Sequence, residues 1–249
     1  MPLISVAIRH QGDNNKLQAF IQTLESQSTE AIEIIILNQS PVENDVLKET
    51  LKTSYPTVVC NETNIETLKE VIRGEYFVLV DSQDSLFEGT LDKMYHALAF
   101  SGAEALVGTY VDLIDGQFYF YSWGEDWLAR TLTNRQGLQM IDHADAQIRK
   151  AFQSFHGKLF KTSLLTQTKE DFPLEQLAWR LYLEAESLVY INHPTYIYTP
   201  RVERTLKETY RETLKNVEER IKACSLLEGY PLEETKRQYM QEQIGRAHV

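Results

Sequence analysis

The chain has 249 residues, a formal net charge of −11 at pH 7 and 43% hydrophobic residues. This size and composition support one sizeable core, or one domain with an appendage. The acidic balance argues against nonspecific binding to nucleic acid or to an anionic membrane, and apolar runs such as Ile34–Leu37 are far too short to span a bilayer.

The N-terminus lacks the basic and apolar regions of a signal peptide, and the two cysteines, Cys60 and Cys224, form no disulfide framework. We therefore expect a reduced, cytoplasmic protein without a transmembrane segment, and leave open a peripheral position at the inner face of the membrane.

The first hundred residues alternate apolar runs with amphipathic segments. The predicted strands are Leu3–Ile8, Ala31–Leu37, Thr57–Cys60 and Tyr76–Val80, and the predicted helices are Asn14–Gln27, Glu43–Thr53, Asn64–Arg73 and Thr90–Phe100. The helices carry apolar residues at i, i+3, i+4 and i+7. This alternation predicts right-handed βαβ units and a parallel sheet.

After Ala103 the regular alternation of predicted strands and helices ends. Asp115-Gly116 lies between two apolar segments and predicts a two-residue hairpin. The later predicted elements are helices near Ala144–Phe152, at Leu174–Ala185 and from Glu203 onward, and extended segments at Phe155–Phe160, Leu188–Ile191 and Thr195–Tyr198.

The stretch Gly74–Glu88 contains the apolar run Tyr76–Val80, which ends in an acidic turn. In open α/β sheets, ligands bind outside the carboxyl ends of the strands, where Asp81 and Asp84 would lie. Two carboxylates on a tight turn can hold a divalent cation, and the cation can hold a diphosphate. In the alternative, Asp81 and Ser82 cap the next helix and Asp84 is solvated.

The sequence Gly-Glu-Tyr-Phe-Val-Leu-Val-Asp-Ser-Gln-Asp-Ser-Leu resembles the segment of family 2 glycosyltransferases, which have the GT-A fold, that ends in Asp-Ser-Asp-Asp. In that family the acidic triplet holds Mg or Mn on the diphosphate of a nucleotide sugar. Here Gln83 replaces the usual third-position Asp, so the motif is degenerate. The resemblance implies a metal site with Asp81 and Asp84 as its acidic ligands.

The resemblance covers roughly Pro2–Lys222. It includes His156–Lys161, which is similar to the family's Lys-Leu-Phe/Tyr-Arg segment, and Val189–Tyr198, which is similar to its late Tyr-rich block. It implies an α/β, mostly parallel GT-A sheet flanked by helices over residues 1–201, followed by a C-terminal helical extension over residues 202–243.

The expected nucleotide contacts depart from the family pattern. Arg9 stands in a segment where the family has Pro-x-Tyr-Asn, and is the candidate for binding the diphosphate. Asn38 and Gln39 replace the family's acidic pair; they can hydrogen-bond a nucleobase, or they form only a turn. His156 and Lys158 are candidates for facing the donor phosphates, with a structural role as the alternative for His156.

An inverting transfer needs a carboxylate that takes the proton of the acceptor hydroxyl. The family places this residue at the start of the acceptor-side helix, which here reads Phe172–Leu177. Glu175 is the first candidate base and Asp171 the second, because the alignment can slide over a shortened loop. Both can instead be helix-start carboxylates favoured by the helix dipole.

The last six residues, Ile244–Val249, resemble the translated read-through of a sequencing adapter. We expect a non-native tail over residues 244–249, a natural protein that continues past Gln243, and a missing C-terminal domain.

The resemblance implies transfer of a sugar from a nucleotide-diphosphate donor, UDP-linked as the first choice, to a hydroxyl of a glycan or glycoprotein of the bacterial cell envelope, with inversion. The alternative is a non-catalytic GT-A-like module of a larger glycan or teichoic-acid synthesis protein, which the altered donor contacts favour. The chain has no Gly-x-Ser-x-Gly, P-loop or Gly-x-Gly-x-x-Gly pattern on which a hydrolase, kinase-like or dinucleotide-binding function could rest.

Overall fold

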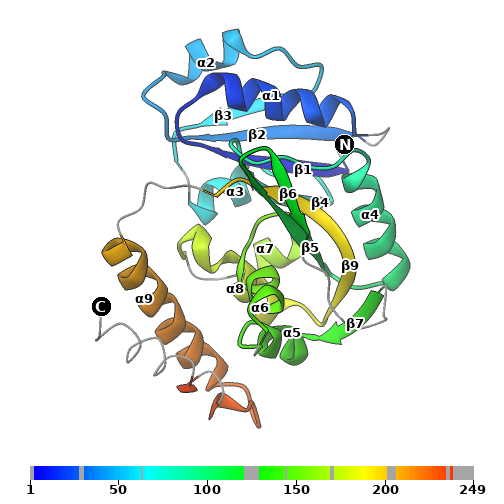
Figure 1. The fold of residues 1–249 in the computed structure, drawn as a ribbon, viewed down its shortest axis with the longest axis vertical. Coiled ribbons are helices and arrows are strands. Elements are labelled where there is room, and N and C mark those ends of the chain that lie inside the picture. Colours follow the sequence, from blue (N-terminus) through cyan, green and yellow to red (C-terminus); the bar gives the residue numbers. More distant parts are fainter. Residues whose placement is uncertain are drawn as a thin grey trace.

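The computed structural model describes residues 3–27, 31–62, 64–120, 129–143, 145–168, 171–200, 206–233 and 236–237. Within these residues, nine strands form one mixed sheet in the order β3-β2-β1-β4-β8-β5-β9-β7, with β6 paired to β5 (Figure 1). Strands β3, β2, β1, β4, β5 and β9 run in the same direction, whereas β6, β7 and β8 run against them.

The first half of the chain has the predicted alternation of strands and helices. The elements are β1 (Ile4–His10), α1 (Asn14–Glu25), β2 (Ile32–Asn38), α2 (Asn44–Thr50), β3 (Thr57–Cys60), α3 (Ile65–Val71), β4 (Tyr76–Asp81) and α4 (Thr90–Ser101). Strand β1 lies between β2 and β4, parallel to both, so that Val6 pairs with Ile34 and with Val78. The predicted parallel arrangement of these three strands is confirmed, with Asp81 at the carboxyl edge.

The second half is less regular. Its elements are β5 (Ala105–Ile114), β6 (Gln117–Phe120), β7 (Ala129–Thr133), α5 (Asn134–Met140), α6 (Ala146–Gln153), β8 (Leu159–Lys161), α7 (Thr162–Gln167), the 3-10 turn η1 (Leu174–Gln176), α8 (Leu177–Glu184), β9 (Ser187–Tyr198) and α9 (Leu206–Cys224). The predicted hairpin is confirmed: Asp115 and Gly116 both have positive φ, at 51° and 76°, and β5 pairs antiparallel with β6.

Three elements of the second half, β7, α5 and α7, were not predicted, and the two predicted late strands are one strand, β9. The expected break falls at Pro194, which has no N–H to donate. The chain passes this point by shifting register against β5 around Thr109, so pairing resumes on both sides of it.

Two hydrophobic cores cover the two faces of the sheet. Successive strand residues point to opposite faces, so Val6 and Val78 join the core under α1 and α4, whereas Ala7 and Leu79 join the core under α5 to α8. By the same alternation Arg9 and Asp81, two residues further along their strands, belong to the second face. The functional groups described below therefore lie on the side of α6 and α8.

Helix α9 packs against the second core. Val217 and Cys224 are buried, and the Trp179 indole on α8 donates a 2.7 Å hydrogen bond to Asn216. The polar helix predicted toward Gln243 and the predicted tail lie mostly or wholly outside the described residues. None of the described helices combines the length and the apolar composition that crossing a bilayer requires.

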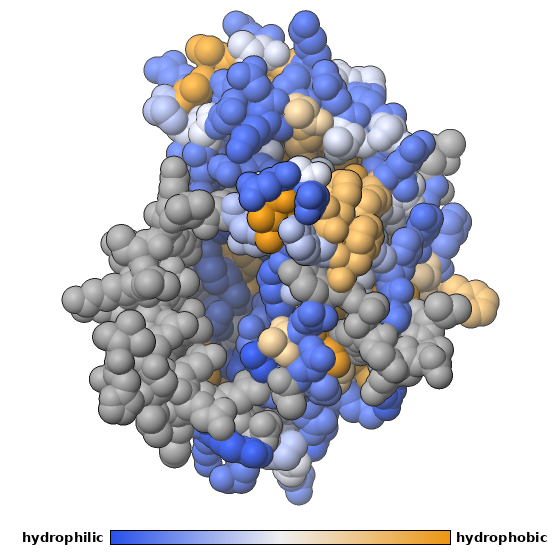
Figure 2. All heavy atoms as spheres, viewed as in Figure 1, coloured by the Kyte–Doolittle hydropathy of each residue, from blue (hydrophilic) through white to orange (hydrophobic). Residues whose placement is uncertain are grey.

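The face shown in Figure 2 is largely hydrophilic. Exposed apolar side chains on it gather over the β5–β6 hairpin, where Phe118 and Phe120 are 49% and 63% exposed.

Candidate functional site

The acidic turn after β4 is buried. Asp81 is the last residue of β4, and the backbone N–H of Asp84 donates to the Asp81 carbonyl at 3.1 Å, which closes a tight turn. Both carboxylates are no more than 5% exposed. The helix-capping alternative does not hold, because α4 begins at Thr90 after Gly89.

The Asp81 carboxylate accepts hydrogen bonds from two side chains. Arg9 donates to it from Nε at 2.6 Å and from Nη2 at 3.0 Å, and His156 Nε2 donates to it at 2.8 Å. Burial alone would raise the pKa of Asp81, but the hydrogen bonds and charges of His156 and Arg9 hold that pKa far below its usual range.

Asp84 has neutral partners instead. It accepts a 2.5 Å hydrogen bond from the Tyr196 hydroxyl and a 2.9 Å hydrogen bond from the Thr199 N–H, so the carboxylate is not solvated as the alternative proposed. Burial raises the pKa of Asp84, and the His156 charge and these two hydrogen bonds offset only part of that shift.

The loop between α6 and β8 places His156 beside these carboxylates. Gly157 has φ +63°, and a Cβ added there would lie 2.5 Å from the Tyr196 Cβ. Only glycine allows this positive φ and close approach together. The His156 ring consequently stacks on the Tyr196 ring, with centroids 5.3 Å apart, and its Nδ1 shares a 2.9 Å hydrogen bond with Ser154.

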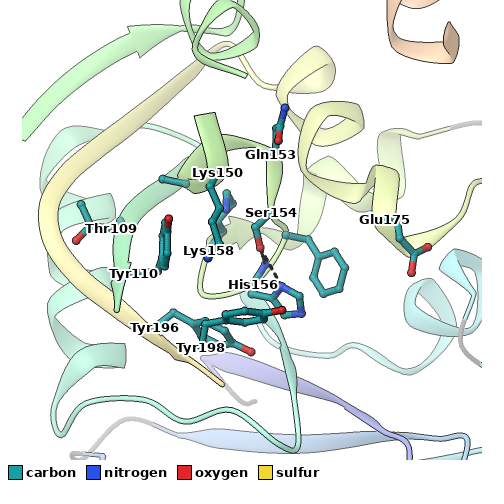
Figure 3. Close-up of a pocket in the computed structure, with 13 residues that line it drawn as sticks. Thr109, Tyr110, Lys150, Gln153, Ser154, His156, Lys158, Glu175, Tyr196 and Tyr198 are labelled. Atoms are coloured by element: carbon teal, nitrogen blue, oxygen red, sulfur yellow. Dashed lines mark hydrogen bonds between the residues drawn. The ribbon is translucent and has the colours of Figure 1, made fainter. Parts of the chain in front are cut away.

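A cavity of about 460 Å³ opens next to His156 (Figure 3). It is lined by Gly108, Thr109, Tyr110, Lys150, Ala151, Gln153, Ser154, Phe155, His156, Lys158, Glu175, Tyr196 and Tyr198. Figure 3 shows Lys150 and Lys158 among the labelled tyrosines and His156, with Glu175 apart from this group. Burial lowers the pKa of Lys158 to about 7.

The two candidate bases lie in different surroundings. Glu175 lines the cavity, is 42% exposed at its side chain, and accepts a 3.1 Å hydrogen bond from Arg9 Nη1. Arg9 therefore connects Glu175 to Asp81. Asp171 is exposed and does not line the cavity.

The two candidates for nucleobase contact stand at the end of β2. The Asn38 amide holds its own loop, donating to the Val42 carbonyl at 2.8 Å and accepting from the Ser40 N–H at 3.0 Å, as the turn alternative requires. Gln39 is exposed and accepts a 2.6 Å hydrogen bond from Gln11. A second, more open hollow of about 570 Å³ lies beside this loop, lined by Ser40, Pro41, Val42, Glu43, Asn44, Asp45 and Asn61.

The turn has side chains suited to a divalent cation. Asp81, Asp84 and His156 offer ligand atoms that all lie within 4.8 Å of one another, and carboxylate oxygens suit Mg and Mn. All four carboxylate oxygens nevertheless accept a hydrogen bond already. The residues fit a cation in kind and spacing, and a cation there would replace Arg9 as the countercharge of Asp81.

Sequence reasoning missed several residues of the site. Tyr110, Lys150 and Ser154 come from β5, from α6 and from the loop after it, with no motif to mark them. Tyr196 and Tyr198 lie in the quoted Tyr-rich block, and their alternation along β9 was the available signal that both face the same side.

The chain matches no protein-family model. It is 26% identical over 215 residues to the glycosyltransferase GlyG of Streptococcus pneumoniae, and the match covers 80% of this chain and 71% of GlyG. It is 24% identical over 259 residues to the glycosyltransferase GlyA of the same organism, and that match covers 96% of this chain but only 37% of GlyA. These relatives support glycosyl transfer as the class of reaction.

Solved structures show the same fold. S. aureus TarS 1-349 in complex with UDP-GlcNAc matches with a TM-score of 0.69 at 15% identity, over 98% of this chain and 73% of TarS 1-349. The mannosyltransferase PcManGT from Pyrobaculum calidifontis, in complex with GDP-Man and Mn2+, matches with a TM-score of 0.57 at 12% identity, over 100% of this chain and 76% of that one. The predicted GT-A-like fold is confirmed.

Proposed function

We propose that this protein is a family 2-like glycosyltransferase that moves a sugar from a nucleotide-diphosphate donor, UDP-linked as the first choice, to a hydroxyl of a cell-envelope glycan or glycoprotein, with inversion. The observation that carries this proposal is the network at the carboxyl edge of the sheet, in which Arg9 joins Asp81 to Glu175 beside a cavity. TarS, with the same fold, binds UDP-GlcNAc.

The order of the strands gives the donor a path. The hollow beside Asn38 and Gln39 lies at β2 and β3, the acidic turn lies at β4, and the cavity next to His156 lies at β5 and β9. If Gln39, on the loop that Asn38 shapes, bound the nucleobase of the donor, the diphosphate of the donor would lie near Arg9 and Asp81. The sugar would then lie toward His156 and the cavity, with Lys158 at its inner wall.

A divalent cation, Mn or Mg, would be held by Asp81, Asp84 and His156 and would neutralise charge on the diphosphate. Arg9 would exchange its contact with Asp81 for one with the donor phosphates, which offer the same charge-assisted hydrogen bonds.

Glu175 is the proposed base, because it lines the cavity in which an acceptor hydroxyl would approach the sugar. Its carboxylate takes the hydroxyl proton as the acceptor oxygen forms a bond to the anomeric carbon and the nucleotide diphosphate leaves from the opposite face. Asp171 is the second choice.

Calorimetric titration with UDP and a panel of UDP-sugars, with and without Mn, tests the donor site. We expect saturable binding that strengthens with Mn and disappears in Asp81→Ala. A parent protein that binds no nucleotide sugar under either condition contradicts the proposal.

The role of Glu175 as catalytic base is tested with two matched variants, Glu175→Gln and Asp171→Asn. The measurement is the rate at which UDP is released from the donor that binds, in the presence of cell-envelope glycan fractions. We expect Glu175→Gln to lower the rate by about 10²–10⁴-fold while Asp171→Asn changes little. A large loss in Asp171→Asn alone would transfer the role to that residue.

A second candidate function, a non-catalytic GT-A-like module of a larger glycan or teichoic-acid synthesis protein, is favoured by the bidentate pairing of Arg9 with Asp81. That pairing satisfies Asp81 without a cation or donor. In this case the protein binds a glycan, the panel of UDP-sugars gives no heat in any condition, and Glu175→Gln has no rate to affect.

A further inference from the structure

The sequence marks Lys158 as a candidate for the donor phosphates, but the donor path proposed above puts the diphosphate at Arg9 and Asp81 and gives this buried lysine of the cavity no ligand group. It is 2% exposed, it precedes β8, and it lines the cavity wall. No hydrogen bond or ion pair of the Lys158 ammonium is found among the residues that the structure describes. Buried lysines are rare unless they are paired.

The other charged groups around the cavity have partners within the protein. Lys150 Nζ lies 3.0 Å from Asp112 Oδ1 and over the rings of Tyr110 and Tyr198, at 4.2 and 4.7 Å from their centroids. Glu175 accepts from Arg9, and His156 donates to Asp81. The carboxylates of Asp112, Glu175 and Asp81 are therefore each held by another cation.

A lysine head group offers three donors and no acceptor. A sugar hydroxyl satisfies it poorly, since each hydroxyl brings a hydrogen of its own that also needs a partner. A carboxylate or a phosphate brings only acceptors, together with the opposite charge. The rings of Tyr110 and Tyr198 line the same cavity, with Lys150 over them, and give its wall aromatic surface beside which a sugar ring can pack.

We propose that this cavity is a subsite for an acidic sugar unit, whose carboxylate or phosphate group is received by the buried Lys158 while its ring packs beside Tyr110 and Tyr198. The inference rests on the proposed function in taking the occupant to be a sugar. The acidic group belongs either to the donor sugar or to the acceptor glycan, and both sources present the same chemistry to Lys158.

The test compares charged and neutral probes of the same shape. Sodium D-glucuronate and D-glucose are titrated into the ¹⁵N-labelled full chain at matched ionic strength, alone and with saturating UDP, and chemical shifts give the dissociation constants. UDP-glucuronate and UDP-glucose form the second pair. We expect the acidic member of at least one pair to bind at least about tenfold more tightly.

The variants are Lys158→Met, which keeps most of the length of the side chain but removes its charge, and Lys161→Met, which removes a nearby lysine that does not line the cavity. Lys158→Met should abolish the preference for the acidic probe, and Lys161→Met should keep it. A preference within the UDP-sugar pair locates the acidic group on the donor, and a preference for free glucuronate in the UDP-saturated protein locates it on the acceptor.

The proposal is overturned if the parent binds both members of each pair equally, a result that needs no variant. It is also overturned if Lys158→Met keeps the preference. Should no UDP-sugar bind while glucuronate binds through Lys158, the proposed function fails and the acidic subsite stands. If UDP-sugars bind without any preference for the acidic members, and free glucuronate shows none either, the acidic subsite fails and the proposed function stands.

Discussion

Arg9 joins the two carboxylates on which the proposed chemistry depends. It is the penultimate residue of the buried strand β1, where alternation points its side chain toward α8 and away from α1. There it reaches Asp81 through two nitrogens and Glu175 through the third, and its guanidinium lies 5.1 Å from the Phe155 ring centroid. A flat, five-donor group can make all of these contacts at once, which a lysine could not.

The acidic turn gives a first prediction for a single residue. Gln83→Asp restores a third carboxylate on the turn, and carboxylates contribute most to binding a divalent cation. We expect Mn-dependent donor binding to strengthen by about tenfold or more, as measured by calorimetry with the donor that the panel identifies. Asp81→Ala should remove that binding in both backgrounds. Unchanged affinity in Gln83→Asp would show that the turn does not hold the metal.

The buried lysine gives a second prediction, in stability. Its pKa is near 7 when folded and 10.5 ordinarily, so between these values the unfolded chain binds a proton that the folded chain lacks. The free energy of unfolding of the parent should therefore rise with pH across this window relative to Lys158→Met, by up to about 1.4 kcal/mol per pH unit. Urea unfolding at pH 6.5, 8 and 9.5 measures the gap, which is the difference in free energy of unfolding between the parent and Lys158→Met. We expect Lys158→Met to be the more stable of the two at pH 6.5. A gap that stays constant with pH would contradict the lowered pKa.

Among the connections between elements, the loop from α6 to β8 brings the site together. It delivers Ser154, His156 and Lys158 within five residues, and it does so against β9, because Gly157 lets the backbone approach Tyr196. The bridge between Leu79 and His156 then fixes the loop to β4 and so to Asp81. These two contacts together set the position of the histidine.

Gly157→Ala tests this contact, with Gly229→Ala as the matched control. Both glycines have positive φ, but a Cβ at Gly229 meets only an arginine side chain at 3.7 Å, whereas one at Gly157 overlaps Tyr196. The positive φ should lower the free energy of unfolding of each variant by about 1 kcal/mol, and overlap with Tyr196 should lower that of Gly157→Ala by about a further 1–3 kcal/mol. Equal losses in urea unfolding would mean that the loop relaxes freely away from β9.

For the molecule as a whole, the long C-terminal helix belongs to the body that carries the site. Arg220 on α9 forms a buried ion pair with Asp142, which follows α5, and Asn216 donates to the backbone carbonyl of Glu175 at 3.3 Å. The helix therefore supports the segment that bears the proposed base.

Asp142→Asn should reveal how firmly α9 is held. It leaves the Arg220 charge buried without its countercharge, and we expect a loss of about 3–5 kcal/mol in urea unfolding. Glu66→Gln is the control, because it breaks the 2.7 Å Glu66–Lys69 pair at the surface, where Glu66 is 58% exposed, and should cost less than about 1 kcal/mol. Similar small losses in both variants would indicate that α9 is held by apolar packing alone.

The tail is tested by deletion. If residues Ile244–Val249 are non-native, their removal should leave the melting temperature unchanged within error. For a chain of this size about 1 kcal/mol corresponds to roughly 2–4 °C, so a drop of several degrees would show that the tail stabilises the fold.

Local sequence alone was enough to predict the strand–helix alternation, the parallel neighbours of β1, the hairpin at Asp115 and Gly116, and the place of Asp81 at the carboxyl edge. These features follow from local periodicity, turn chemistry and the right-handed connection of βαβ units. Tertiary structure was needed to establish that Arg9 binds Asp81 and Glu175 together, that Asn38 holds its own turn, and that Lys158 is buried. Contacts between residues as far apart as 9 and 175 depend on strand order and helix packing. No local pattern encodes these, because the same side chain serves as a surface charge, a turn residue or a buried ligand according to what packs against it.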